Sequence, residues 1–172
     1  MSDAIHVCSL ARLEETVQAT AARYVITAIN PLSIPATPAG VSDKNHLRVA
    51  INDIDAPHGE LVHPEAHHIE RIIGFANRWN RDGPLVIHCL AGISRSSASA
   101  FITACTLNPN ANEHLIAQTL REASATARPN PLMIELADGL LDRDGRMIAA
   151  IKALSPGAAT MEAGTFSLPS CY

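Results

Sequence analysis

Short apolar runs alternate with longer segments in which apolar residues recur at helical spacing, and this alternation continues along most of the chain. The expected strands cover residues 5–8, 24–29, 46–52 and 85–88. The expected helices cover residues 10–22, 64–79, 96–107, 113–123, 132–141 and 147–154. Strands that alternate with helices are typical of a parallel sheet covered by helices. The pattern therefore predicts one α/β domain, over residues 1–154, with a mostly parallel central sheet flanked by helices.

Two segments fall outside this alternation. Residues 30–43 contain three prolines and a glycine, and they are expected to form a loop because proline lacks an amide donor. In residues 155–172, further proline and glycine residues interrupt any period. This last segment is predicted to be a poorly ordered C-terminal tail.

Composition and charge restrict the classes of function. Apolar residues make up 47% of the 172 residues, which is enough to bury a core. The formal net charge is −4 and basic residues form no dense run, so we expect neither a nucleic acid nor a membrane as partner. The amino-terminal residues carry charges where a signal peptide needs an apolar stretch, and the four cysteines lie far apart. These features predict a cytoplasmic protein with reduced thiols, of which Cys8 and Cys105 are expected to be buried and structural.

The strongest chemical signal is the run His88-Cys89-Leu90-Ala91-Gly92-Ile93-Ser94-Arg95-Ser96, which joins an expected buried strand to an expected helix. A tight turn at the carboxyl end of a parallel strand can direct successive backbone amides inward, and the next helix adds partial positive charge at its N-terminus. Gly92 permits a close approach that a β-carbon resists, and Arg95 offers a planar fork for two phosphate oxygens. The residues from Leu90 to Arg95 are therefore predicted to bind a phosphate dianion.

Cys89 stands at the base of this predicted loop, where the positive field favours the thiolate over the thiol. A thiolate can attack phosphorus in line and take the phosphoryl group as a cysteinyl-phosphate, which splits hydrolysis into two steps. Ser96 follows the arginine, and its hydroxyl is a candidate donor to the sulfur when the sulfur leaves in the second step. His88, which precedes the cysteine, is expected to support the loop.

Phosphoryl transfer from an alkoxide or phenoxide also requires a proton donor for the leaving oxygen, and the loop itself offers none. Asp53 and Asp55 follow an expected strand that is a candidate neighbour of the strand leading to Cys89. Asp53 is the first candidate for the general acid because it follows its strand most closely. Asp55 is the alternative acid, and His58 is a third candidate.

The run HCLAGISRSS resembles the signature of the cysteine-dependent protein phosphatases, Cys-x5-Arg-Ser, in the form carried by the dual-specificity subgroup of the protein-tyrosine phosphatases. The resemblance covers roughly residues 5–142 and includes the late loop Ala127-Arg128-Pro129-Asn130-Pro131. It implies that the side chain of Asn130 braces the phosphate loop. It also implies a dual-specificity phosphatase-like fold and hydrolysis of phosphotyrosine without a metal or other cofactor, with phosphoserine and phosphothreonine as further candidate substrates.

The expected substrate is a phosphorylated protein or a small phosphomonoester. Relatives directed at phosphoinositides carry lysines inside the loop, whereas positions 90, 91, 93 and 94 hold Leu, Ala, Ile and Ser, so an inositol headgroup is disfavoured. One alternative is a binding module that captures a phosphorylated partner without turnover, because neither aspartate reaches the leaving oxygen. Another is a rhodanese-like sulfur transferase, which does not require Arg95 and Ser96. An acyl hydrolase is disfavoured because Ser96 replaces the second glycine of the G-x-S-x-G motif.

Four histidines lie close together in the sequence, namely His58, His63, His67 and His68. The order His-Pro-Glu-Ala-His differs from that of the zincins, in which a glutamate immediately follows the first histidine, and no third ligand stands at a diagnostic spacing. We therefore predict no metal site, and we expect these histidines to be solvated side chains at the start of a helix.

Overall fold

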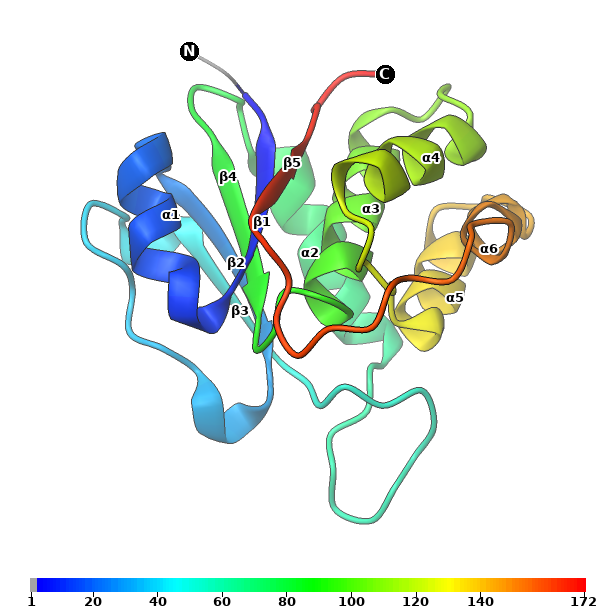
Figure 1. The fold of residues 1–172 in the computed structure, drawn as a ribbon, viewed down its shortest axis with the longest axis horizontal. Coiled ribbons are helices and arrows are strands. Elements are labelled where there is room, and N and C mark those ends of the chain that lie inside the picture. The colour runs from blue at the N-terminus through cyan, green and yellow to red at the C-terminus, as the bar shows by residue number, and fades with distance from the viewer. Residues whose placement is uncertain (1–2) are drawn as a thin grey trace.

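A five-stranded sheet runs through the centre of the computed structural model, which describes residues 3–172 (Figure 1). The strands lie in the order β3-β2-β4-β1-β5. Their bounds are Ile5–Ser9 for β1, Tyr24–Ile29 for β2, His46–Ala50 for β3, Leu85–Cys89 for β4 and Phe166–Leu168 for β5. The first four strands are parallel to their neighbours, and β5 pairs with β1 in the antiparallel direction. The predicted mostly parallel sheet is confirmed.

Helices cover the two faces of the sheet unequally (Figure 1). One face carries α1 (Leu13–Thr20). The other side holds α2 (Ala66–Arg78), α3 (Arg95–Leu107), α4 (Glu113–Ala123), α5 (Pro131–Leu140) and α6 (Arg146–Lys152). The larger hydrophobic core lies on this second side, around α3, while a small cluster that includes Val25 and Val86 packs beneath α1. Within residues 3–172, no helix is long and apolar enough to cross a membrane.

Several predicted elements are shorter in the structure than in the sequence analysis, and two of them border the loops around the site. The helix expected over residues 10–22 is a 3-10 turn, Leu10–Arg12, followed by α1, which ends where Ala21 adopts a left-handed conformation with φ of 53°. The strand expected over residues 46–52 ends at Ala50. The residues after Ala50 leave the sheet and form the loop that carries the candidate acids.

The segment 155–172 differs most from the expectation, because it takes a defined path across the molecule and is not a loose tail (Figure 1). It adds β5 to the edge of the sheet, with Phe166 opposite Val7 of β1. Phe166 and Leu168 are buried in the larger core, and the hydroxyl of Ser170 donates to a carboxylate oxygen of Asp3 at 2.6 Å. A strand of three residues is too short to show a period, and its proline and glycine neighbours are equally typical of disorder.

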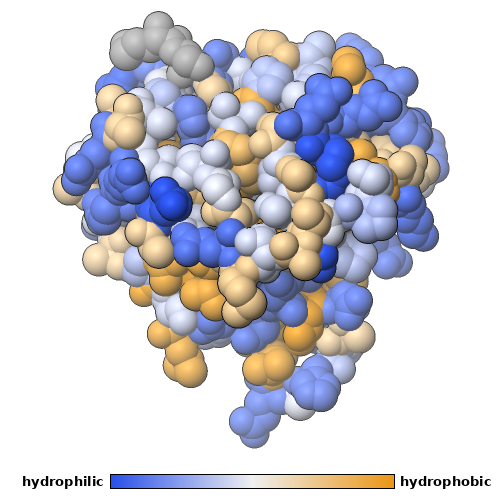
Figure 2. Space-filling model, viewed as in Figure 1, coloured by the Kyte–Doolittle hydropathy of each residue, from blue (hydrophilic) through white to orange (hydrophobic). Residues whose placement is uncertain are grey.

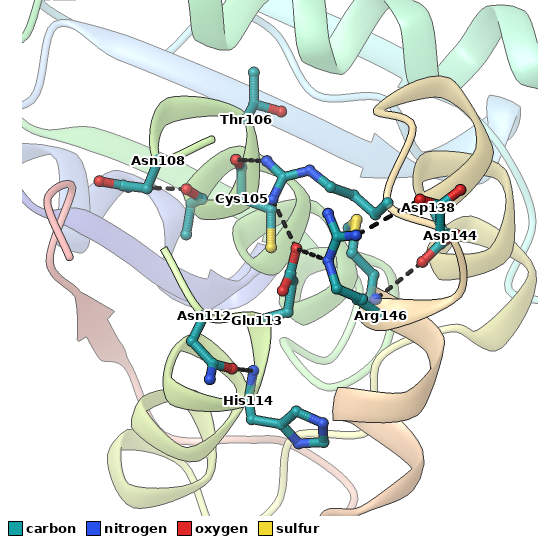
Figure 3. Close-up of polar contacts among 12 residues, drawn as sticks. Cys105, Thr106, Asn108, Asn112, Glu113, His114, Asp138, Asp144 and Arg146 are labelled. Atoms are coloured by element: carbon teal, nitrogen blue, oxygen red, sulfur yellow. Dashed lines mark hydrogen bonds and ion pairs between the residues drawn. The ribbon is translucent and has the colours of Figure 1, made fainter. Parts of the chain in front are cut away.

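A buried ion pair stabilises the packing of the helices on the second side of the sheet (Figure 3). A guanidinium nitrogen of Arg143 donates to a carboxylate oxygen of Glu113 at 2.7 Å, and the side chains of both residues are about 5% exposed. Another nitrogen of Arg143 donates to the carbonyl of Cys105 at the end of α3, and Nε of Arg146 reaches the same oxygen of Glu113. Burial raises the pKa of Glu113, but the backbone hydrogen bond and the two arginines outweigh burial and lower it. Glu113 is therefore charged at neutral pH and ties α4 to α3 and to the start of α6.

Candidate active site

The loop from Cys89 to Arg95 connects the carboxyl end of β4 to the first turn of α3. We call it the phosphate loop. Gly92 adopts φ of 75°, which L side chains rarely adopt. A β-carbon at Gly92 would lie 3.0 Å from the backbone carbon of Cys8 and 3.0 Å from the backbone nitrogen of Ser9. The loop therefore packs against the end of β1 in a way that requires glycine.

The backbone carbonyls of the phosphate loop accept hydrogen bonds from donors outside the loop, and they therefore point outward. Five of its carbonyls accept from donors in other segments or from a neighbouring side chain. The pairs are His88 Nδ1 to Cys89 O at 3.3 Å, Leu10 N to Leu90 O at 3.1 Å, Ala163 N to Ala91 O at 2.9 Å, Arg128 N to Ile93 O at 2.9 Å and Asn130 N to Ser94 O at 3.4 Å. The amides of residues 90–94 find no acceptor among the described residues. Free inward amides are what an anion nest requires.

One guanidinium nitrogen of Arg95 is hydrogen-bonded, and another has no hydrogen-bond partner within residues 3–172. Its side chain is almost fully buried, and a terminal nitrogen donates to the carbonyl of Ile51 at 2.9 Å. Its Nε is buried and has no hydrogen-bond partner in residues 3–172. A buried donor without a partner is costly, so this nitrogen is available to an anion held by the phosphate loop. The geometry suits the predicted role of Arg95 as a phosphate-binding fork.

Cys89 lies at the base of the loop with its side chain 2% exposed. Its sulfur is 3.1 Å from the hydroxyl oxygen of Ser96, which stands in the first turn of α3. Burial raises the pKa of two other thiols, to about 11 for Cys8 and to about 12 for Cys105. These two remain protonated thiols at neutral pH, in the buried positions that the sequence predicts.

Of the two candidate acids, Asp53 contacts the phosphate loop. Its Oδ1 accepts a hydrogen bond from the hydroxyl of Ser94 at 2.7 Å and a second from Nδ2 of Asn130 at 3.1 Å. Asp55 and His58 are exposed, and no hydrogen bond joins them to the loop within residues 3–172. The carbonyl of Ile54 accepts a further bond from Nδ2 of Asn130 at 3.1 Å. The structure thus brings Asp53, the first candidate, to the mouth of the loop.

Asn130 links three parts of the site. Its Oδ1 accepts from the backbone amide of Met133 and so caps the start of α5. Its Nδ2 faces Asp53, and its backbone amide donates to Ser94. The late loop before α5 therefore contacts both the phosphate loop and the acid loop, a position consistent with the bracing role that the family resemblance implies.

The end of the chain forms part of the site, which the sequence analysis did not foresee. The amide of Ala163 donates to Ala91, and the hydroxyl of Ser9 donates to the neighbouring Glu162 at 2.6 Å. Arg128 donates twice to the carbonyl of Gly157, at 2.6 and 3.0 Å. No motif or period marks these contacts, because backbone groups of a proline- and glycine-containing segment make most of them.

The histidine group differs in one member from the prediction of solvated side chains. His58 and His67 are exposed and His63 is half-buried, whereas His68 is only 6% exposed. Nδ1 of His68 accepts a hydrogen bond from the backbone amide of Glu65 at 3.1 Å, and so helps to cap the start of α2. Within residues 3–172, no group of three or more His, Cys, Asp or Glu residues is arranged to hold a metal ion.

The central strand of the sheet ends in a loop whose amides are unpaired within residues 3–172, with a cysteine at its base and an arginine at the start of a buried helix, an arrangement suited to binding an anion. The family model for the protein-tyrosine phosphatases matches residues 57–134, which include this loop. The matched segment, just under half of the chain, is therefore similar to the protein-tyrosine phosphatases. No curated protein is significantly similar to it in sequence.

Solved structures of dual-specificity phosphatases share the fold. Human DUSP28 is 20% identical with a TM-score of 0.62, over 81% of this chain and 88% of its own. DUSP15 is 15% identical with a TM-score of 0.61, over 88% of this chain and 92% of its own. PTPMT1, solved in complex with PI(5)P, is 16% identical with a TM-score of 0.63, over 83% of this chain and 92% of its own. At these identities the likeness establishes the dual-specificity phosphatase-like fold and nothing finer.

Proposed function

We propose that this protein hydrolyses phosphate monoesters through a cysteinyl-phosphate intermediate. The observation that supports this most directly is the outward orientation of five phosphate-loop carbonyls, which leaves the amides of residues 90–94 free around Cys89. Together with the free Nε of Arg95, these amides provide donors for the three non-bridging oxygens of a phosphoryl group. The charge that develops in phosphoryl transfer is stabilised by such fixed donors.

In the first step, the thiolate of Cys89 attacks phosphorus and the bond from phosphorus to the ester oxygen breaks. Asp53, in its carboxylic acid form, gives its proton to that leaving oxygen. In the second step, the carboxylate of Asp53 takes a proton from water while the water oxygen attacks phosphorus and the bond to sulfur breaks. Ser96 donates a hydrogen bond to the departing sulfur, from 3.1 Å in the present structure. Inorganic phosphate leaves, and both residues return to their starting forms.

The surroundings of the loop support an aromatic phosphate ester, such as phosphotyrosine in a protein, as substrate. Leu90 is 52% exposed, and exposed apolar side chains also follow β2 and β3 at the same edge of the sheet, namely Leu32 and Leu61. Met161, close to the contact between Ala163 and Ala91, is 94% exposed. Figure 2 shows apolar atoms along the lower edge of the molecule, where these loops lie. Apolar contacts of this kind suit an aromatic ring.

One observation favours the second candidate, a phosphate-binding module without turnover. The Oδ1 of Asp53 is already engaged by Ser94 and Asn130, and an acid that stays tied there cannot protonate a leaving group. Hydrolysis of p-nitrophenyl phosphate in the presence of a chelator separates the two candidates. We expect turnover by the wild type and none by Cys89→Ser. A wild type that binds vanadate but shows no Cys89-dependent turnover is a binding module.

A further inference from the structure

A chain of buried polar side chains leads from the phosphate loop across three strands toward the far edge of the sheet. It consists of His88 in β4, Thr27 in β2 and His46 in β3, each at most 6% exposed. Oγ1 of Thr27 lies 2.6 Å from Nε2 of His88 and 2.7 Å from Nε2 of His46. One hydroxyl group therefore joins two imidazole rings in the interior of the protein.

The alternation of side chains along the strands brings these groups together. Val25 and Val86 face the small cluster beneath α1, and side chains two residues further along each strand point to the same face. Those side chains are Thr27 and His88, which are direct partners in the pairing of β2 with β4. The hydroxyl of Thr27, in an otherwise apolar part of β2, therefore contacts His88, which precedes Cys89.

The direction of each hydrogen bond follows from the chemistry of the groups. The carbonyl of Cys89 can only accept, so Nδ1 of His88 carries the hydrogen of their 3.3 Å contact. Burial lowers the pKa of His88 to about 4, so the ring is neutral at pH 7 and its Nε2 is a bare acceptor. The hydroxyl of Thr27 must therefore donate to His88. Because the hydroxyl of Thr27 has only one hydrogen, its oxygen accepts the hydrogen bond from Nε2–H of His46.

The outer end of the chain meets charged groups at the surface. Burial lowers the pKa of His46 to about 4, so at pH 7 its Nδ1 is also a bare acceptor, 3.2 Å from the hydroxyl oxygen of Thr37. Thr37 accepts from Arg48 at 2.5 Å and donates its one hydrogen to the carboxylate of Asp43, so it does not donate to His46. Arg48 further lowers the pKa of His46, and Asp43 opposes this. From His46 inward, every hydrogen of the chain points toward Cys89.

We propose that Thr27 is a positioning residue for the phosphate loop, because its hydroxyl, which His46 contacts from the other side, pairs Nε2 of His88 and holds the ring where its Nδ1–H keeps the carbonyl of Cys89 outward. This inference deepens the proposed function, since it concerns the same loop. Without the Thr27 hydroxyl, Nε2 of His88 lies bare and unpaired in the interior. The ring is then no longer held on that side, so its bond to the carbonyl of Cys89 weakens and one of the five carbonyls is held less firmly.

The test compares Thr27→Val, which has nearly the same shape but no hydroxyl, with Thr27→Ser, which restores the hydroxyl. Thr103→Val is the matched control, because Thr103 is fully buried in α3 and its hydroxyl has no partner in residues 3–172. Nitrogen-15 NMR of the imidazole rings reports directly which nitrogen of His88 carries the hydrogen. Vanadate affinity and the kcat/KM and pH profile for p-nitrophenyl phosphate report the state of the loop.

We expect a slowly exchanging Nδ1–H signal of His88 in the wild type, in Thr27→Ser and in Thr103→Val, and loss of that signal in Thr27→Val, where the ring is no longer held against the carbonyl of Cys89. Vanadate affinity and kcat/KM should fall about tenfold in Thr27→Val and change less than about twofold in the other two variants, as expected for one unpaired buried acceptor. His46→Leu leaves the Thr27 hydroxyl able to donate to His88 and should change both readouts less than Thr27→Val does. Thr27→Ala, which also lacks the hydroxyl, serves if Thr27→Val does not fold.

Retention of the slowly exchanging Nδ1–H signal and of full vanadate affinity in Thr27→Val, or in Thr27→Ala where that variant replaces it, overturns the inference. The inference is also overturned if Thr27→Ser shows the same loss of the Nδ1–H signal and of vanadate affinity as Thr27→Val, because that result assigns Thr27 a packing role. The NMR and vanadate measurements require no turnover. An inactive wild type would therefore contradict the proposed function and leave the test of this inference intact.

Discussion

The hydroxyl of Ser94 donates a hydrogen bond to the carboxylate of Asp53 at 2.7 Å and so ties the loop after β3 to the phosphate loop. The same carboxylate oxygen accepts from Asn130, which belongs to a third loop. Three segments that are far apart in the sequence therefore converge on one oxygen at the mouth of the site. The other oxygen of Asp53 accepts no hydrogen bond from residues 3–172, and it is the atom we expect to carry the transferable proton.

If Asp53 is the general acid, Asp53→Asn should lower kcat by about 100-fold or more, the usual contribution of general acid catalysis, whereas Asp55→Asn should retain most activity. The loss should be larger for phenyl phosphate than for p-nitrophenyl phosphate, because the poorer leaving group depends more on protonation. The pH dependence of kcat/KM should lose its basic limb only in Asp53→Asn. Loss of that limb in Asp55→Asn alone would assign the acid to Asp55 instead.

The main elements of the fold could be predicted from the sequence because each leaves its own periodic signal. The apolar residues that recur at helical spacing up to Trp79 predict α2, and the apolar run that starts at Leu85 predicts the buried central strand. β5 gives no such signal, because its three residues are held by pairing with β1, a contact more than 150 positions away in sequence. Long-range pairing of this kind is decided by tertiary packing and not by local preference.

The phosphate loop could be predicted because its chemistry is concentrated in consecutive residues, from His88 to Ser96. The groups that shape it from outside could not be. The donor of Ala163 and the acceptor of Ile51 are backbone atoms, which every residue possesses, so no residue type marks them. Thr27 interrupts an apolar strand, but a single threonine in a strand is most often unremarkable.

Replacing Arg143 by Met should destabilise the protein by about 3–5 kcal/mol, because the carboxylate of Glu113 would remain buried without its main partner. Arg146→Met is the matched control. Its side chain is 51% exposed, and its loss should cost less than about 1 kcal/mol. Adding Glu113→Gln to Arg143→Met should recover part of the loss. Urea unfolding monitored by circular dichroism gives the three values, and equal costs for the two arginine variants would contradict this account of the ion pair.

Replacing Phe166 by Ala should cost about 3–5 kcal/mol, because the ring is buried in the larger core. Met161→Ala, in the same segment but 94% exposed, should change the free energy of unfolding by less than about 0.5 kcal/mol. Because Ala163 holds the carbonyl of Ala91 outward, Phe166→Ala should also weaken vanadate binding at temperatures where the domain remains folded. A negligible change in stability for Phe166→Ala would mean that the segment is the loose tail that its composition suggests.

The two buried histidines of the Thr27 chain should make the fold sensitive to acid. Burial lowers the pKa of His46 and of His88 from 6.5 to about 4, so the unfolded chain binds protons that the folded chain does not. The stability they contribute is fully present above about pH 6.5 and is lost as the pH falls toward 4, with a slope of up to about 1.4 kcal/mol per pH unit for each histidine. Unfolding in urea between pH 4.5 and 7.5 measures this slope.

In His46→Leu the slope should fall by up to about one such contribution, because one of the two titrating rings is gone. His67→Gln removes an exposed histidine and should leave the slope unchanged. His6 and His68 are shifted in the same direction, also mainly by burial, so part of the acid sensitivity should persist in the His46 variant. An unchanged slope in His46→Leu would show that this ring binds protons as readily in the folded state as in the unfolded chain, which would contradict the effect assigned to its burial.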